Sequence, residues 1–319
     1  MSTYGAIRAR LDADEIVMLD GAIGTEILRR DLSWADHQVL AYPDKIRGIH
    51  EDYIRAGADV LTTNTFQLAR WSFENHFRDR VHLRHIGAPD LETRADALLT
   101  AAVRLAREAR DRVATGREVA IAGAVTTLEW CFRPDLAPSQ EVMRAEYREI
   151  MDTMARAGAD LILLETVNSV AEARVGLEAA HEVGLPCWVS FVCDERGRLF
   201  TGETMADAAR ALTPLDPEAI LLNCAPPSDV TVGLRELARA YDGPKGAYAH
   251  IGRFDPPEWM FTDEFPPDLY LAEARRWVEL GARILGGCCG TTPDHIAALV
   301  GGLRRANAST RSGGTPTRC

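Results

Sequence analysis

Short apolar runs recur along the chain, and a longer segment in which apolar positions follow a helical spacing separates each run from the next. The eight runs occupy residues 16 to 21, 59 to 66, 118 to 125, 160 to 166, 186 to 193, 219 to 224, 245 to 251 and 282 to 289. Most are continuously apolar, as strands buried on both faces of a parallel sheet must be. Eight strand–helix units in 319 residues predict a (β/α)8 barrel, with a doubly wound open sheet as the alternative.

The helical segments carry their own start and stop signals. The segment "SQEVMRAEYREIMDTMARAGA" begins with a candidate N-cap, Ser139, and has Gly158 near its end. Ala-Gly-Ala or Leu-Gly-Ala also stands directly before two other strands, at Gly57 and Gly281. This recurrence indicates repeated helix–strand joints and favours the barrel over the open sheet.

Composition narrows the class of protein. The formal charge of −11 argues against a general nucleic-acid binder, because neutralising phosphates requires clustered Lys and Arg, and we expect a small-molecule substrate. No signal-peptide pattern and no stretch near the length of a membrane span is present, which predicts a soluble cytoplasmic protein without a membrane partner. We expect one domain over residues 1–306, and a disordered tail over the polar, Gly-rich residues 307–319.

Polar residues close several of the predicted strands. Because the active site of a barrel is built from the carboxyl ends of its strands, these residues are the candidates for chemistry, although each one alone is also compatible with a turn. They are Asp20, Asn64, Thr65, Glu165, Cys224, His250, Cys288 and Cys289.

The cysteines among them suggest a metal. Cys288 and Cys289 are adjacent in "LGGCCGTT", and Cys224 ends the sixth strand, 64 residues earlier. On a barrel the three sulfurs can converge, and three thiolates on tetrahedral zinc leave the fourth position open, as in a catalytic site. The alternative for Cys224 alone is a small buried side chain. His250 is a possible fourth ligand in the absence of substrate, and the alternative there is a hydrogen-bonded rim residue.

Two other barrel chemistries are excluded by the residues present. A Schiff-base aldolase needs a lysine at the carboxyl end of a strand, whereas the lysines are Lys45 and Lys245, and Lys245 begins its strand. Metal-dependent hydrolases of this shape usually carry His-x-His, and none of the eight histidines forms that pattern.

Five motifs together resemble a known family. "MLDGAIGTEI", "ADVLTTNTF", "ADLILLETVNSVAEA", "LLNC" and "GARILGGCCGTTPDHI" are similar to the zinc-dependent homocysteine S-methyltransferases, which include betaine–homocysteine methyltransferase and the homocysteine-binding module of cobalamin-dependent methionine synthase. The resemblance runs from about residue 16 to 303. It implies zinc ligands at Cys224, Cys288 and Cys289. It also implies that the amino-acid end of homocysteine is held by a set of substrate-binding residues, namely Asp20, Gly21, Asn64, Thr65 and Glu165.

The resemblance also implies a reaction. Zinc coordination ionises the thiol of homocysteine, and three cysteine thiolates keep the bound sulfur nucleophilic toward the methyl group of an onium donor such as S-methylmethionine, S-adenosylmethionine or a betaine. Two stretches depart from the family pattern, "AGAVTTLEWCF" after strand three and "YAHIG" after strand seven, and they leave the donor open. The aromatic candidates for contact with an onium cation are Trp34, Trp71, Trp130, Phe132 and Trp259.

Three alternatives remain at the level of function. The acceptor is another thiol or a selenol, the methyl group comes from a separate corrinoid protein, or the chain is a catalytically inactive zinc-binding barrel. Asp20 and Glu165 favour an enzyme, because the storage of zinc requires no site for an ammonium group.

Overall fold

The structure is a computed structural model that describes residues 2–30, 38–72, 91–129, 131–255, 258–260, 262 and 264–312. Within them, eight parallel strands pair in the order β1-β10-β7-β6-β5-β4-β3-β2. The strands are β1 (Val17–Met18), β2 (Val60–Thr62), β3 (Ala120–Thr126), β4 (Leu161–Val167), β5 (Cys187–Phe191), β6 (Ala219–Asn223), β7 (Lys245–Tyr248) and β10 (Ile284–Leu285). A parallel bridge between Leu19 and Val60 joins the two ends of this order, so the predicted (β/α)8 barrel is confirmed.

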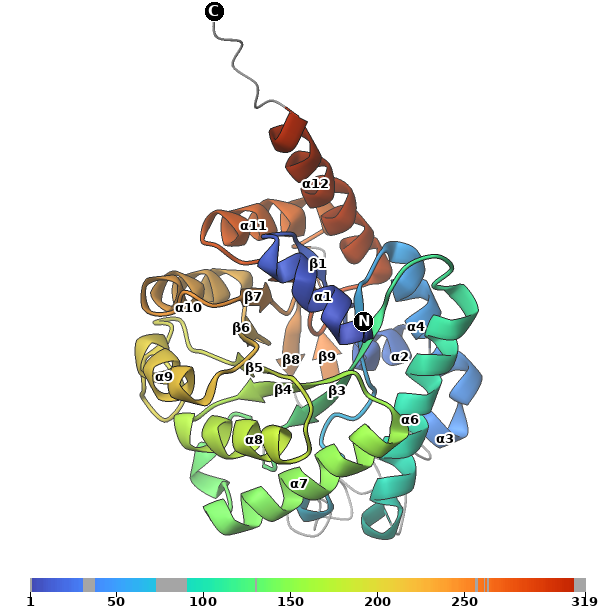
Figure 1. The fold of residues 1–319 in the computed structure, drawn as a ribbon, viewed down its shortest axis with the longest axis vertical. Helices are drawn as coiled ribbons and strands as arrows, with labels where there is room; N and C mark the ends of the chain where they lie inside the picture. The colour runs from blue at the N-terminus through green and yellow to red at the C-terminus, as the bar shows by residue number, and fades with distance from the viewer. Residues whose placement is uncertain are drawn as a thin grey trace, which may run out of the picture.

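Helices surround the strands on the outside, as Figure 1 shows. They are α1 (Thr3–Asp12), α2 (Ile23–Arg29), α3 (Gln38–Ala41), α4 (Pro43–Ala56), α6 (Leu91–Val113), α7 (Gln140–Ala157), α8 (Val170–Glu182), α9 (Met205–Leu212), α10 (Pro227–Ala240), α11 (Pro267–Glu279) and α12 (Pro293–Ser312). Two short 3-10 turns (Pro134–Leu136 and Thr213–Leu215) and a hairpin of β8 (Arg253–Asp255) and β9 (Glu258–Met260) complete the described elements.

The helix signals in the sequence correspond to real caps. The Ser139 side chain accepts a hydrogen bond from the N–H of Val142, and Gly158 ends α7 in the left-handed conformation. Gly57 ends α4 in the same way, and Gly281 also has a positive φ before β10. The predicted helix–strand joints are therefore confirmed.

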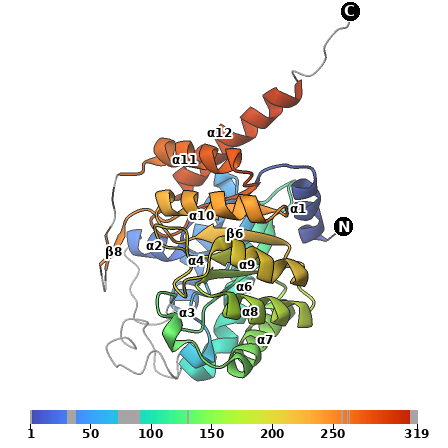
Figure 2. The ribbon, with the colours of Figure 1, turned by 90° about the vertical axis from the view of Figure 1, so that its left-hand side faces the viewer.

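One end of the barrel is closed by α1. The barrel interior holds side chains such as Val17, Leu163 and Leu221, and the apolar face of α1 packs onto this layer. The indole N–H of Trp188 donates to the hydroxyl of Tyr4 at 3.1 Å. In Figure 2 this helix and the hairpin strand β8 lie on opposite sides of the molecule. The end next to α1, where the strands begin, is thus sealed, and access to the barrel is from the end where the strands finish.

The last helix runs farther than the sequence suggested. Helix α12 continues to Ser312, across the domain boundary predicted at residue 306, and it projects away from the barrel (Figure 2). Residues 307–312 continue the helix because no strong helix breaker occurs before Gly313 and Gly314. Residues 313–319 lie outside the described part, and their disorder stays a prediction. None of the described helices is long and apolar enough to span a membrane.

Candidate active site

Three cysteine sulfurs meet at the open end of the barrel. The Sγ atoms of Cys224, Cys288 and Cys289 all lie within 4.8 Å of one another. Cys224 and Cys288 form a disulfide with their Cα atoms 5.7 Å apart, and Cys289 is a free thiol. Sulfurs bound to one tetrahedral zinc ion at about 2.3 Å stand about 3.8 Å apart, so the group has the size and chemistry of a metal site once the disulfide is reduced. The disulfide and the metal-bound state use the same two sulfurs and exclude each other.

The backbone at Cys224 adopts an unusual conformation. Its φ is +50°, in the left-handed region that side chains other than glycine rarely occupy. The preceding residue, Asn223, is fully buried and its side-chain oxygen accepts from Ser190 at 2.8 Å and from the N–H of Thr166 at 3.2 Å. The end of β6 is therefore fixed by buried hydrogen bonds. Strain held in this way is typical of functional sites, and here it sets the direction of the thiol.

Glycines let the loop of the cysteine pair lie close to its neighbours. A Cβ at Gly286 would lie 2.5 Å from the Cβ of Leu19, and one at Gly290 would lie 1.9 Å from the carbonyl oxygen of Ile251. Gly290 also has a φ of +85°. The N–H of Gly287 donates to the carbonyl of Asp20 at 3.0 Å. The "GGCCG" motif therefore brings the two cysteines against the end of β1.

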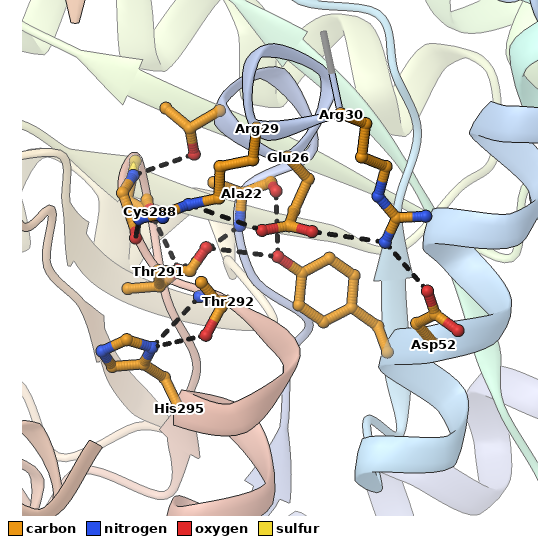
Figure 3. A network of polar contacts seen from close by, with 12 residues as sticks. Ala22, Glu26, Arg29, Arg30, Asp52, Cys288, Thr291, Thr292 and His295 are labelled. Carbon is orange, nitrogen blue, oxygen red and sulfur yellow. Dashed lines mark hydrogen bonds and ion pairs between the residues drawn. The ribbon is translucent and has the colours of Figure 1, made fainter. Parts of the chain in front are cut away.

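A hydrogen-bond network holds this loop to the segment after β1 (Figure 3). The Thr291 hydroxyl donates to the Cys288 carbonyl at 2.7 Å, and the Gly290 N–H donates to the Thr25 hydroxyl at 2.9 Å. The guanidinium of Arg29 donates to the carbonyl of Gly290 at 3.2 Å. The metal-site loop and the loop that carries Asp20 are thus one connected unit.

Two carboxylates lie at the same end without a cationic partner. Asp20 is 2% exposed and accepts from the N–H and hydroxyl of Thr62 at 2.9 and 3.0 Å. Glu165 accepts from the Tyr248 hydroxyl at 3.0 Å. Neither carboxylate forms an ion pair with any described residue. No described residue therefore neutralises the charge of these two carboxylates.

Burial raises the pKa of three acidic groups at this rim. Burial raises the pKa of Asp20 well above its usual value, and the charge of Glu165 raises it further, whereas the bonds from Thr62 lower it. Burial raises the pKa of Glu165 to about 7 although the Tyr248 hydroxyl lowers it. Burial, with the charge of Glu165, raises the pKa of Cys289 to about 11. A cation between the carboxylates and another at the sulfurs would favour all three charged forms.

The other predicted substrate residues lie at the same rim with different partners. A Cβ at Gly21 would lie 2.8 Å from the Tyr53 hydroxyl, so only glycine fits there. The Asn64 amide nitrogen is buried and has no hydrogen-bond partner. The Thr65 hydroxyl donates to the carbonyl of Ala124 at 2.6 Å and so joins the ends of β2 and β3. Asn64 is therefore available to a ligand, whereas the Thr65 hydroxyl is already engaged, and the role of both in binding stays a prediction.

His250 does not join the sulfurs. Among the described residues the ligand-atom group consists of the three cysteines, and the His250 ring is hydrogen-bonded to the backbone of Cys224. Burial lowers the pKa of the ring, against the effect of that bond. This contact matches the hydrogen-bonded alternative that the sequence left open, and zinc ligation by His250 stays a prediction.

Sequence reasoning missed several residues that complete the site. Thr62 and Tyr248 hold the two carboxylates, and each is the last residue of its strand. Both belong to stretches noted in the sequence, "ADVLTTNTF" and "YAHIG", but neither was predicted as a site residue. Asn168 donates its amide to the carbonyl of Cys131 at 2.7 Å, while its buried side-chain oxygen has no partner. Burial raises the pKa of Cys131 to about 12, with smaller contributions from Cys289 and Glu165, so this thiol lies near the cluster. Tyr248 could have been predicted from the alternation of side chains along a strand. It lies two residues before His250, and residues two apart point to the same face.

An aromatic pair lies on the loops around this opening. The rings of Phe132 and Phe200 are 5.5 Å apart at an interplanar angle of 71°, and they are 50% and 39% exposed. The Thr201 hydroxyl donates to the carbonyl of Asn168 at 3.1 Å, so the loops after β3, β4 and β5 are joined below the pair. Trp71 is partly buried and its indole N–H donates to Glu129 at 3.3 Å. The remaining aromatic candidates lie outside the described residues or side chains, namely Trp34, Trp130 and Trp259.

Comparison with known proteins identifies what this arrangement is similar to. The family model for homocysteine S-methyltransferase matches residues 17–302. A homocysteine S-methyltransferase of Escherichia coli is 30% identical over 94% of this chain and 99% of its own length, and a selenocysteine methyltransferase of Astragalus bisulcatus is 26% identical over 90% and 92%. The crystal structure of the homocysteine methyltransferase MmuM from Escherichia coli in its metallated form superposes with a TM-score of 0.75 at 27% identity, covering 93% of this chain and 99% of that one.

Proposed function

Since the chain belongs to the homocysteine S-methyltransferase family, we propose that it transfers a methyl group to the sulfur of homocysteine and so forms methionine. One observation carries this proposal. Three cysteine sulfurs within 4.8 Å of one another and two carboxylates without cationic partners share one rim of the barrel. A small molecule with a thiol and an ammonium group suits this rim, because the thiol can bind a metal held by the cysteines and the ammonium group can bind the carboxylates.

The metal we propose is zinc, held by Cys224, Cys288 and Cys289. The sulfur-only donor set and the spacing of the sulfurs support zinc, which accepts thiolates in tetrahedral geometry. Zinc, when bound, lowers the pKa of a fourth thiol so that this thiol is ionised near neutral pH. The tight loop of Gly286 and Gly290 holds two of the sulfurs in place before any ligand arrives.

The carboxylates orient the substrate. Asp20 and Glu165 would accept hydrogen bonds from the ammonium group of homocysteine, and Thr62 and Tyr248 fix the carboxylate orientations for that contact. The free amide nitrogen of Asn64 is a donor for the substrate's carboxylate. Binding the amino-acid end in this way directs the thiol toward the cysteines, and the thiolate then takes the methyl group while the donor leaves with the electron pair of the broken bond.

We propose an onium compound as the methyl donor, S-methylmethionine, S-adenosylmethionine or a betaine. The support is the exposed pair of Phe132 and Phe200, because aromatic faces attract cations. Such a donor loses its positive charge in the reaction, so its product binds less well to the aromatic faces and is released.

A selenol is the second candidate acceptor. The similarity to a selenocysteine methyltransferase favours it, and selenocysteine carries the same ammonium and carboxylate groups as homocysteine. Its chain is shorter by one methylene, so the distance between the carboxylates and the sulfurs decides between the two acceptors.

The test is a methyl-transfer assay on the zinc-loaded, reduced protein. Homocysteine or selenocysteine is offered with S-methylmethionine, S-adenosylmethionine, a betaine or a methylated corrinoid protein, and the methylated product is quantified. We expect methionine from homocysteine with one onium donor. Turnover with the corrinoid protein alone would refute the onium donor, and bound zinc without turnover on any pair would identify an inactive barrel.

A further inference from the structure

A cavity lined by arginines lies between the loop after β5 and helix α10. Its volume is about 290 Å³, and it separates the turn after β5 from the outer face of α10. The turn contributes Arg196 and Arg198, and α10 contributes Arg235 and Arg239. We call these four residues and the space between them the arginine pocket. The chain has a formal charge of −11, so such a concentration of positive charge is not a property of its surface in general.

The two sides of the pocket are held together by the backbone. The Asp194 side chain accepts from the N–H groups of Arg196 and Arg198 at 2.9 and 2.8 Å, which fixes the turn. Gly197, with a φ of +72°, packs on α10 so closely that a Cβ there would lie 3.0 Å from the Cα of Gly233. The pocket is therefore formed in the free protein, and a ligand does not have to assemble it.

The arginines on the helix have no acidic partner. Arg235 and Arg239 lie one turn apart on α10, both exposed, and neither forms an ion pair with a described residue. The one carboxylate in the lining, Glu236, accepts from the N–H of Met205 at 3.2 Å and so caps α9 instead. Two like charges at this spacing repel each other on a helix.

Arginines on several other helices form ion pairs with acidic residues one turn away. Arg55 pairs with Glu51 at 2.8 Å on α4, and Arg156 pairs with Asp152 at 3.0 Å on α7. On the turn, Arg198 donates to the carbonyl of Gly202 at 3.2 Å, which orients its guanidinium, and Arg196 stands 3.8 Å from Glu195. The helix side of the arginine pocket thus differs from the usual pattern in this chain, in which acidic residues offset helix arginines.

We propose that the arginine pocket binds the diphosphate group of a small molecule. Guanidinium groups form paired hydrogen bonds with phosphate oxygens, and four of them around one concavity suit an anion with several oxygens better than a single carboxylate. The volume accommodates more than one phosphate group. Val232, 36% exposed, lines the same cavity and offers an apolar contact to the organic part of the molecule. A nucleic acid would need a basic stripe, and the acidic chain offers a pocket instead.

Calorimetric titration of the full chain tests the proposal. The probes are inorganic pyrophosphate, inorganic phosphate and adenosine diphosphate. We expect pyrophosphate and the nucleotide to bind with a Kd of about 1 mM or below and more tightly than phosphate. Arg235→Ala/Arg239→Ala should weaken their binding at least about tenfold, and the double Lys variant should lie between, because it keeps the charge and loses the paired hydrogen bonds.

The matched control is Arg55→Ala/Arg156→Ala, which removes the same charge from two other helices and should leave the Kd unchanged. Pyrophosphate also complexes metal ions and could bind at the zinc site. The test is therefore the difference in Kd between the pocket variant and the control variant, because both variants keep the zinc site unchanged. Equal binding by the wild type and the pocket variant, or no binding up to about 10 mM, would overturn the proposal. Methyl transfer by the pocket variant should equal that of the wild type, so the result does not depend on the proposed function.

Discussion

The two ends of the barrel treat a buried carboxylate in opposite ways. At the end next to α1, Asp59 is 3% exposed and pairs with Arg10, Arg117 and Arg304, while its oxygen also accepts the N–H of Met18 at 2.8 Å. At the other end, Asp20 is equally buried, accepts two hydrogen bonds from Thr62 and forms no ion pair with a described residue.

This difference separates stability from function. A buried charge costs free energy unless it is paired, and the protein offsets that cost at Asp59 with three guanidinium groups. At Asp20 and Glu165 no described residue supplies a positive charge that would offset the cost. We infer that the end next to α1 fixes the fold and that the rim of the cysteines is kept poised for a cation.

The largest expected effect, a loss of zinc and of methyl transfer, comes from replacing a cysteine at the rim. Cys288→Ser should lose most of about one zinc per chain, because two thiolates do not retain the metal against a chelator. Methyl transfer should fall by more than about a hundredfold. Replacing a residue that only hydrogen-bonds to a metal ligand lowers activity by up to about a hundredfold, and the loss of the ligand itself should lower it further. Zinc analysis and the transfer assay measure both. Cys187→Ala, at a buried cysteine in β5, is the control and should keep its zinc; stoichiometric zinc in Cys288→Ser would disprove the ligand assignment.

The converse change, at the end next to α1, should act on stability alone. Asp59→Asn leaves three arginines facing one another, and the free energy of unfolding should fall by about 2–4 kcal/mol. This value is smaller than that for breaking a fully buried pair, because the arginines are about one-third exposed. Urea unfolding measures it. Homocysteine affinity of the folded variant should match the wild type, and a selective loss of affinity would contradict the division between the two ends.

Glu165→Gln tests by ligand binding whether the carboxylates at the cysteine rim differ in role from Asp59. The variant should bind homocysteine about 10- to 100-fold less tightly, as expected for a charge-assisted contact of about 1.5–3 kcal/mol. An analogue without the amino group should lose much less. Calorimetry with both thiols gives the ratio, and an equal loss for the two would show that Glu165 acts on the fold and not on the ammonium group.

The stability of the same variant, compared with that of the wild type, should depend on pH. Burial raises the pKa of Glu165 from 4.5 to about 7, so the folded state holds this proton more strongly than the unfolded state. The wild type therefore loses stability relative to Glu165→Gln as pH rises from 5 through 7, and the loss is complete near pH 8. Urea unfolding without ligand at pH 5 and pH 8 checks this. A difference in stability between the two proteins that is the same at pH 5 and pH 8 would refute the account.

The smallest expected effect concerns the aromatic pair. Phe132→Ala should raise the KM for an onium donor about two- to fivefold, the range of an exposed cation–π contact of about 0.5–1 kcal/mol, and leave the KM for homocysteine unchanged. Leu136→Ala is the control, since Leu136 is 44% exposed on the same loop and has no ring. Equal changes in both variants would assign the pair a purely apolar role.

The sequence by itself determined the elements and the chemistry of the rim. Continuous apolar runs define the strands, Ser139 and Gly158 mark the ends of α7, and the polar residues that close the runs lie at one end of the barrel, as the parallel pattern requires. These features depend on neighbours along the chain, or on a rule that holds for every parallel barrel, and the pattern therefore reveals them. The boundary at residue 306 stays a prediction, although α12 continues to Ser312, because the polar composition of residues 307–312 says little about helix formation next to a packed helix.

Only the tertiary structure decided which charges are paired. Asp20 closes one predicted strand and Asp59 begins another, which assigns them to opposite ends of a barrel but does not show which side chains pair with either one. Arg304 reaches Asp59 across 245 residues of sequence, and Tyr248 reaches Glu165 across 83. Such partners are set by the closure and register of the barrel, because a side chain meets whichever residues the neighbouring strands bring to its level. The sequence supplied the carboxylates, and the fold decided which of them pair with arginines.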